Sequence, residues 1–366
     1  MSGSRTKRQQ EPRWPTRSEA EALARVGAPV IGIGGSSGKT VTLRLLRSLL
    51  EHRGTRVVAG LDNAMDRAGR ATRHDWVLLE LPASVPHDPP GALDVLILTG
   101  MAADELPPGT DLPAATAVLS QAVAETRRAL VLNADDARLL ALASSAAVPV
   151  HTASVNGARS GARLADGHLQ LRCDGAEHRV VAISRTNYAH PPLTSDMLVA
   201  AAAAALLGTD PDVVRSVLLA HRPPAGCHEA LGSARGVLWV DDGRATRPGR
   251  AAAALAGHGE PVVVVAGGRD EGQSFARWAR AAAASASSAL LFGSAAEPMA
   301  RTLHAMGLTD RIVRCSDLED AVSIASRVAE RGDTVLYSPG APPEVSPGAP
   351  AFRDLAPLAE RRREAA

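Results

Sequence analysis

Residues 30–40 constrain the fold of this chain more than any other segment. An apolar stretch, VIGIG, leads into a loop of small residues and then into a stretch with helical spacing that ends at Arg53. The loop consists of Gly35, Ser36, Ser37, Gly38, Lys39 and Thr40. In such a strand–loop–helix unit the backbone N–H groups and the helix N-terminus face a phosphate, while the lysine contacts the β- and γ-phosphates and the threonine can bind Mg²⁺. The segment predicts a phosphate site in an α/β fold.

The spacing departs from the common pattern G-x-x-x-x-G-K-[ST], because Ile33 stands five residues before Gly38 and the glycine is at position 32. A glycine-rich turn that binds nothing is therefore an alternative interpretation. Amino-acid usage argues against it, since only Lys7 and Lys39 are lysines among the 40 Lys and Arg residues. Lysine and arginine are not interchangeable at a phosphate, so a lysine retained here favours phosphate binding.

Short β-branched runs alternate with stretches of helical spacing along the first half of the chain. The runs 30–34, 56–60, 75–81, 94–100, 129–136 and 148–154 are predicted to be buried strands, and 18–26, 40–53, 112–128, 134–145 and 197–207 helices. Such alternation is typical of a mostly parallel, doubly wound sheet. Residues 163–185 instead alternate apolar with polar side chains and predict an antiparallel edge or a small added sheet.

A second series of strands follows a Pro- and Gly-containing linker at 221–229. These runs lie at 236–242, 261–268, 288–294, 311–317 and 333–339. We therefore predict an α/β protein in which a doubly wound central domain with a phosphate-binding P-loop precedes a smaller, Rossmann-like α/β domain. The expected boundaries are a tail at 1–28, a central domain at 29–222 and a C-terminal domain at 223–366.

Charge, hydropathy and cysteine content exclude several classes of function. The net charge of +1 provides no general attraction to nucleic acids or anionic membranes. We identify no signal peptide or membrane-spanning run, so we expect a cytoplasmic protein with small-molecule partners. The spacing of Cys173, Cys227 and Cys315 fits neither a disulfide framework nor a cysteine-based zinc site.

Polar residues follow several of the predicted strands. Glu80 ends an apolar strand, so its carboxylate is expected at the sheet edge where ligands bind, as a Mg²⁺ ligand. In the second half, VDDGRATRP at 240–248 supplies carboxylates, arginines and a threonine, and AGGRDEG at 266–272 adds glycines that permit close approach of a ligand. Solvated loops at the ends of strands are the alternative interpretation of these segments.

Together these segments resemble the Mur ligase family, in particular its D-glutamate-adding branch. The resemblance covers about residues 29–356 and rests on six segments in the family's order. They are Gly34 to Thr40, Glu80 to Ala83, Leu132 to Asp136, Asp242 to Arg247, Ala266 to Asp270 and Gly332 to Pro339.

The resemblance implies ATP-dependent amide formation, in which a carboxylate receives the γ-phosphate and an amine then displaces it. It implies that Lys39 acts on the phosphoryl group together with Mg²⁺ held by Thr40 and Glu80. Asp242 is expected to bind the nucleotide ribose, and Arg244, Thr246 and Ser338 the carboxylate of the amine substrate. Arg244 is also expected to be catalytic, and the C-terminal domain to close over the central one and exclude water.

Several of the family's residues are replaced in this sequence. The carbamylated lysine that holds a second metal falls on Ser120, and the metal-binding histidine falls near Asp104 and Glu105, whose carboxylates could bind Mg²⁺ instead. An adenine-contacting asparagine falls at about Val199, and an arginine falls at Cys227.

The family's UDP-binding N-terminal domain has no counterpart in the 28 residues before the first strand. The primary hypothesis is therefore an active ATP-dependent ligase that joins a small, non-UDP acid to an amine or amino acid. A degenerate ligase that binds nucleotides or a partner is a second hypothesis, and a cell-wall ligase whose substrate is presented by a partner chain is a third. An unrelated P-loop kinase or GTPase is a fourth, although no N-K-x-D segment is present.

Overall fold

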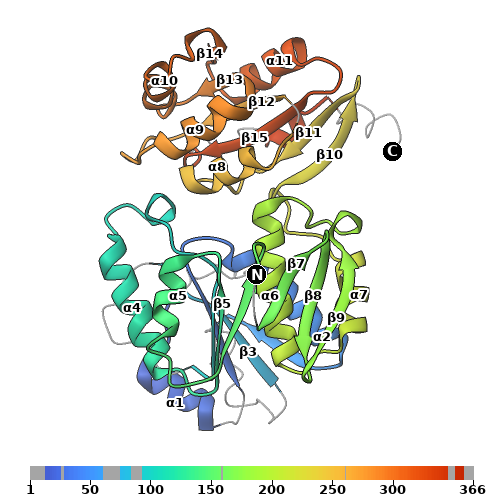
Figure 1. Ribbon diagram of the computed structural model, residues 1–366. Coiled ribbons are helices and arrows are strands. Elements are labelled where there is room, and N and C mark those ends of the chain that lie inside the picture. Colours follow the sequence, from blue (N-terminus) through green and yellow to red (C-terminus); the bar gives the residue numbers. More distant parts are fainter. Residues whose placement is uncertain are drawn as a thin grey trace, which may run out of the picture. The chain divides into compact units, whose positions relative to one another are not determined.

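The computed structural model describes residues 13–25, 29–60, 75–83, 93–157, 160–259, 261–344 and 351–357, and it divides into two compact units. The first unit comprises residues 1–101, 110–186 and 195–221, and the second comprises 102–109, 187–194 and 222–366. The main boundary lies near residue 222, and two short segments that precede it in the sequence, 102–109 and 187–194, also belong to the second unit. Each unit is an α/β structure built on its own sheet (Figure 1).

The first unit is built on a nine-stranded sheet with the order β2-β3-β1-β4-β5-β6-β7-β8-β9. Pairing is parallel from β2 to β7, and β8 pairs antiparallel with both β7 and β9. The strands are β1 (Val30–Gly34), β2 (Arg56–Ala59), β3 (Asp75–Glu80), β4 (Val95–Leu98), β5 (Ala129–Asn133), β6 (Val150–Ser154), β7 (Gly161–Ala165), β8 (His168–Cys173) and β9 (Ala176–Ala182). The predicted antiparallel segment is therefore confirmed as one edge of this sheet.

The helices of the first unit pack in pairs beside this sheet, α4 with α5 and α2 with α7 (Figure 1). Aspartates at the N-caps of α4, α5 and α7 accept hydrogen bonds from first-turn N–H groups, which satisfies donors that have no partner within the helix. The helices are α1 (Arg17–Arg25), α2 (Lys39–His52), α4 (Leu112–Glu125), α5 (Ala137–Ala143), η2 (Ile183–Arg185), α6 (Pro191–Leu206) and α7 (Pro211–Ala220).

The predicted helix boundaries need three corrections. The helix expected at 112–128 ends at Glu125, because the N–H groups of Arg127 and Arg128 donate to carbonyls at 93 and 94 and lead into β5. Helix α5 starts at Ala137 because Asp136 is its N-cap. Helix α6 starts before the predicted alanine run, since prolines are compatible with a first helical turn. Helix α1 covers 17–25, whereas Val26 and residues 1–12 of the predicted tail lie outside the described residues.

The second unit is built on a six-stranded sheet with the order β10-β11-β15-β12-β13-β14. All pairs are parallel except β10 with β11. The strands are β10 (Glu229–Ala234), β11 (Val237–Asp241), β12 (Val262–Gly267), β13 (Ala286–Phe292), β14 (Ile312–Arg314) and β15 (Thr334–Gly340). Strand β10 was not predicted, because its sequence EALGSA is polar and glycine-containing, as expected for an edge strand that pairs on one side only.

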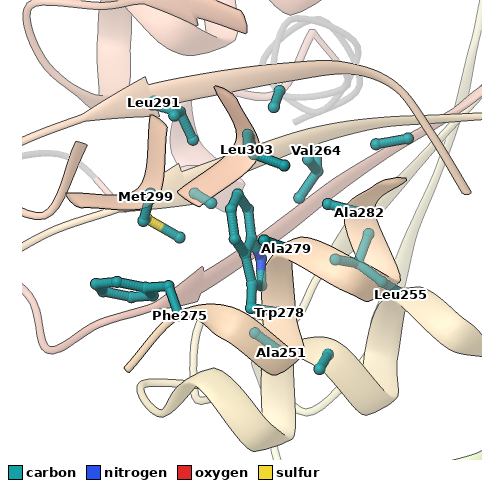
Figure 2. Close-up of a cluster of buried hydrophobic side chains, with 14 of the residues drawn as sticks. Ala251, Leu255, Val264, Phe275, Trp278, Ala279, Ala282, Leu291, Met299 and Leu303 are labelled. Carbon is teal, nitrogen blue, oxygen red and sulfur yellow. The ribbon is translucent and has the colours of Figure 1, made fainter. Parts of the chain in front are cut away.

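Both faces of the second sheet are buried. Along β12, Val262, Val264 and Ala266 belong to one hydrophobic cluster, whereas Val263 and Val265 belong to another on the opposite face. The first cluster contains Trp278 among residues of α8, α9 and α10 (Figure 2). The helices are η1 (Ala103–Glu105), α8 (Pro248–Ala256), α9 (Ala276–Ser285), α10 (Ala296–His304), η3 (Thr309–Arg311), α11 (Leu318–Val328) and α12 (Phe352–Leu355). Among the described residues no helix is both long and apolar enough to span a membrane.

Candidate functional site

The glycine-rich loop of the first unit connects β1 to α2 and needs glycine at two positions. Gly35 has φ 132° and Gly38 has φ 79°, both in the region that favours glycine. A Cβ on Gly35 would lie 2.5 Å from the Thr99 hydroxyl and 2.8 Å from the Gly100 carbonyl oxygen. A Cβ on Gly38 would clash with the carboxylate of Asp196. The loop is thus pressed against the end of β4 and the start of α6.

The start of α2 has the features of an anion site. Gly38 is the N-cap residue and makes no side-chain cap, and the first turn contains no acidic residue. An anion at this point would accept hydrogen bonds from the first-turn N–H groups and would interact favourably with the helix dipole. The Lys39 ammonium folds over the loop and donates to the Gly35 carbonyl oxygen at 2.8 Å. Lys39 therefore lies at the loop, where a phosphate would meet it.

Thr40 and Glu80 meet beside this loop. The Thr40 hydroxyl lies 2.9 Å from Glu80 Oε2 and 3.1 Å from Oε1. The contact follows from the sheet, because β1 and β3 are parallel neighbours with Ile33 in register with Glu80. Both strands therefore end at the same edge. A hydroxyl and a carboxylate at this point are the hard oxygen ligands that Mg²⁺ prefers.

Sequence reasoning missed Thr99, Asp196 and the structural role of Asn133. The Thr99 hydroxyl lies within hydrogen-bonding distance of the carbonyl oxygens of Gly34 and Ser37, at 3.1 and 2.5 Å. Asn133 in turn donates to the Thr99 carbonyl oxygen at 3.1 Å. Thr99 follows β4, Asn133 ends the neighbouring strand β5, and Asp196 lies in α6. Strand order and helix packing bring them to the loop, so no local pattern signalled Thr99 or Asp196.

The second unit has a cleft of about 950 Å³ at the carboxyl ends of its strands. Among the lining residues are Asp241, Gly243, Tyr337, Phe352 and Arg353. Arg353 donates to Asp241 at 2.8 Å and to Glu229 at 2.9 Å, and the Tyr337 and Phe352 rings stack with centroids 4.9 Å apart. Of these groups, sequence reasoning named the segments that contain Asp241 and Tyr337 but not Phe352 or Arg353, which come from α12, far along the chain.

Asp242 and Ser338 are buried and directly follow the cleft residues Asp241 and Tyr337 in the sequence. The Ser338 hydroxyl, fully buried, donates to Asp242 Oδ2 at 2.9 Å, and the backbone N–H of His228 donates to Oδ1 at 3.0 Å. Burial raises the pKa of the Asp242 carboxyl to about 7, although Arg250, Ser338 and His228 oppose that rise. Ser338 thus contacts Asp242. The contact of Ser338 with the substrate carboxylate and the contact of Asp242 with the nucleotide ribose both stay predictions.

Arg244 and Thr246 follow Asp242 on the same loop. The Arg244 side chain is exposed, and among the described residues no carboxylate forms an ion pair with it. Its backbone N–H donates to the Gly226 carbonyl oxygen at 3.0 Å, and Thr246 is partly buried. A cationic side chain held at an exposed loop can bind a carboxylate, so the structure leaves both substrate assignments as predictions.

The glycines of the AGGRD segment line the cleft of the second unit and also have a structural function, while their role in ligand approach stays a prediction. Gly267 has φ 140° and Gly268 has φ 121°, and a Cβ at either would clash with backbone oxygens of Phe292 or Pro342. The space that these glycines leave is filled by the chain itself. Next to them, Glu271 pairs with Arg247 at 2.9 Å and with Arg269 at 2.7 Å.

Asp104 and Glu105 belong to η1 in the second unit, and Asp104 already has a cationic partner. Its Oδ1 lies 3.4 Å from Arg277, and both acidic side chains lie against Gly249 in the first turn of α8. A carboxylate at a helix N-terminus is stabilised by the helix dipole. The assignment of Asp104 and Glu105 as metal ligands stays a prediction. The other two predicted ligands, Thr40 and Glu80, contact each other within the first unit.

The three positions where expected family residues are replaced have ordinary structural environments. Ser120 lies part-buried on α4, Val199 is buried in α6, and Cys227 is buried just before β10 and is not part of a disulfide.

Comparisons with known proteins agree with these features. Residues 228–340 match a family model described as "Mur ligase, glutamate ligase domain". A UDP-N-acetylmuramoylalanine–D-glutamate ligase of Frankia casuarinae is 31% identical over 327 residues, which cover 87% of this chain and 68% of that protein. The chain belongs to the Mur ligase family. The family resemblance drawn from the six segments is confirmed.

Other Mur ligases support the same conclusion. A ligase of the same name from Chromobacterium violaceum is 31% identical over 87% of this chain and 71% of its own. Among solved structures, a MurF ligase from Thermotoga maritima in complex with ADP has a TM-score of 0.63 at 19% identity, covering 87% of this chain and 78% of that chain. A MurF structure from Acinetobacter baumannii has a TM-score of 0.66 at 17% identity, with 87% and 75% covered. These structures share the fold, and Mur ligases are ATP-dependent ligases that form amide bonds.

Proposed function

We propose that this protein is an active ATP-dependent ligase that joins a carboxylic acid to the amine of an amino acid. The acid receives the γ-phosphoryl group of ATP to give an acyl phosphate and ADP, and the amine then displaces inorganic phosphate to form the amide. The observation that carries the proposal is the group formed by Lys39, Thr40 and Glu80 at one sheet edge. A cation and two metal-ligating oxygen groups beside a helix N-terminus suit a nucleoside triphosphate with its magnesium ion.

The residues of the loop suit ATP and Mg²⁺. Gly35 to Gly38 provide the curved backbone, and the first turn of α2 offers N–H groups to phosphate oxygens. Thr40 and Glu80 would hold the ion, which would supply charge neutralisation at the transferring phosphoryl group. The Lys39 ammonium would exchange the Gly35 carbonyl for a phosphate oxygen, its preferred charged partner.

The second unit offers groups suited to an amino-acid substrate. Its cleft contains the carboxylates of Asp241 and Glu344 and the guanidinium of Arg353, and the exposed Arg244 side chain stands on the loop after β11. A carboxylate of the substrate would pair with Arg244, whereas its ammonium group, before deprotonation, would be attracted to the acidic side chains. This arrangement favours an amino acid over an uncharged amine.

Phosphate release from MgATP tests the proposal. The purified protein is incubated with amino acids, including D-glutamate, and with carboxylic acids that include both small acids and UDP-N-acetylmuramoyl-L-alanine. The UDP-linked acid represents the activity for which the similar ligases are named, and the small acids represent our prediction from the sequence. Release that requires one acid and one amino acid, with an amide product of matching mass, is the expected result. Tight binding of MgATP with no phosphate release in any combination would instead establish a nucleotide-binding module.

Glu80→Gln is expected to weaken the magnesium dependence of nucleotide binding. The amide keeps a hydrogen-bonding partner for Thr40 but lacks the negative charge that a metal ligand supplies. We expect about 10- to 100-fold weaker MgATP binding, and unchanged ATP binding in EDTA. Calorimetric titration with and without Mg²⁺ measures both. Glu51→Gln, on the same unit but paired with Arg47 at the surface, is the matched control, and equal losses in the two variants would contradict the assignment.

A further inference from the structure

Three histidines from separate segments of the second unit converge on one point. His190 precedes α6, His228 precedes β10, and His258 follows α8. One ring nitrogen from each can be chosen so that all three lie within 4.8 Å of one another. The His190 and His228 rings stack with centroids 3.3 Å apart, and each lies 5.2 Å from the His258 ring. No other group of three or more His, Cys, Asp or Glu side chains in the described part of the chain meets this criterion.

The backbone around the cluster fixes the positions of its members. His228 has φ 48°, a conformation that costs energy for a residue with a side chain, and its N–H donates to the buried carboxylate of Asp242. The His190 ring occupies the space beside Gly257, where a Cβ would clash with its Nε2. A strained residue and a side chain packed onto a glycine both indicate a defined arrangement. A chance gathering of surface imidazoles would need neither.

The surroundings of His228 suit metal binding. His228 is partly buried, and a neutral imidazole offers a ring-nitrogen lone pair to a metal ion. His228 Nδ1 is buried without a hydrogen-bond partner among the described residues.

The spacing of the nitrogens is close to that of a metal site. With Zn–N bonds of 2.0–2.1 Å, tetrahedral geometry places ligand nitrogens about 3.3 Å apart. The candidate ligand atoms lie within 4.8 Å of one another. Rotations of the side chains that separate the stacked rings would bring them to the spacing of a metal site. Three imidazoles are a ligand set for zinc or a related transition ion, whereas Mg²⁺ prefers oxygen ligands.

We propose that His190, His228 and His258 form a binding site for a divalent transition metal, Zn²⁺ in the first instance, with a water molecule as the fourth ligand. The site is additional to the ATP and magnesium site proposed above, from which it differs in unit, residues and ligand chemistry. A bound ion would connect the segment 187–194, the start of β10 and the end of α8 within the second unit.

The test uses the full-length protein stripped with EDTA and titrated with Zn²⁺ in calorimetry, and with Co²⁺ in visible absorption. We expect one strong site per chain and the intense absorption of tetrahedral Co²⁺. His258→Ala and His190→Ala are expected to weaken Zn²⁺ binding by more than about 100-fold, because even groups that only support a metal ligand contribute 10- to 100-fold. His304→Ala is the matched control, since this exposed histidine lies on α10 of the same unit.

Gly257→Ala provides a test that keeps all three histidines. Gly257 has φ −85° and ψ −5°, so alanine fits the backbone, and the nearest atoms that the added methyl group would meet belong to the His190 ring and to Pro191. Weaker Zn²⁺ binding with an unchanged circular dichroism spectrum is expected. The proposal is overturned if the wild-type protein does not bind Zn²⁺ stoichiometrically. It is equally overturned if His190→Ala, His258→Ala and Gly257→Ala all bind Zn²⁺ as tightly as His304→Ala does.

Discussion

Lys39→Ala is expected to reduce ATP-dependent phosphate release by about 100- to 1,000-fold, the usual effect of removing one group that stabilises transition-state charge. The ammonium lies over the glycine-rich loop and donates to the Gly35 carbonyl oxygen, and alanine removes this charge. MgATP affinity is expected to fall as well, because on our proposal the lysine contacts phosphate in the ground state. Steady-state phosphate release and calorimetric titration with MgATP measure the two effects separately.

Two further variants make the Lys39 result specific. Lys39→Arg keeps the charge but replaces a compact ammonium with a planar guanidinium, so it is expected to remain impaired. Arg47→Ala removes a cation of the same helix that pairs with Glu51 at the surface, and it is expected to leave both measurements unchanged. If Lys39→Ala released phosphate at the wild-type rate and had the circular dichroism spectrum of a folded protein, the assignment of this loop to phosphate binding would be contradicted.

Trp278→Ala is expected to lower the free energy of unfolding by about 3 to 5 kcal/mol. Trp278 is completely buried between α8, α10 and the sheet of the second unit, where it packs in the cluster with Leu255, Phe275 and Met299 (Figure 2). Truncation removes a large apolar surface and leaves a cavity. Urea unfolding followed by circular dichroism, with the transition of the second unit analysed separately from that of the first, measures the change.

Trp278→Phe separates the effect of ring packing from the effect of the buried indole N–H group. The indole Nε1 is buried without a hydrogen-bond partner among the described residues, so phenylalanine removes an unsatisfied donor while keeping most of the ring. We expect it to cost clearly less than alanine does. Val328→Ala is the control at an exposed position, where the side chain is 42% exposed, and should change stability by no more than about 0.5 kcal/mol. Equal stability of Trp278→Ala and Val328→Ala would show that this cluster does not stabilise the unit.

Local patterns in the sequence were sufficient for much of the fold. The strand–helix alternation predicted both α/β units, and each predicted strand of the two parallel sheets appears within a few residues of its expected position. This succeeded because strands buried on both faces give continuous apolar runs that turn residues interrupt. Strand β10 was missed for the opposite reason: as a polar edge strand with Gly232, it lacks that pattern.

The candidate site was predictable to the extent that its residues are local in sequence. Gly35 to Thr40 are consecutive, so their shared function could be inferred from type and spacing. Glu80 could be placed at the sheet edge because it ends a strand, but its contact with Thr40 required β1 and β3 to be neighbours. Thr99 and Asp196 carry no motif of their own.

The sequence by itself determined which elements form, the position of the glycine-rich loop and the family to which the chain belongs. These properties depend on backbone preferences and hydrophobic periodicity over a few residues, or on ordered motifs. Tertiary structure alone decided which distant side chains meet, including Arg353 with Asp241 and the three histidines at 190, 228 and 258. Such contacts depend on strand order and helix packing, which are set by burial of the whole core, and no local pattern encodes them.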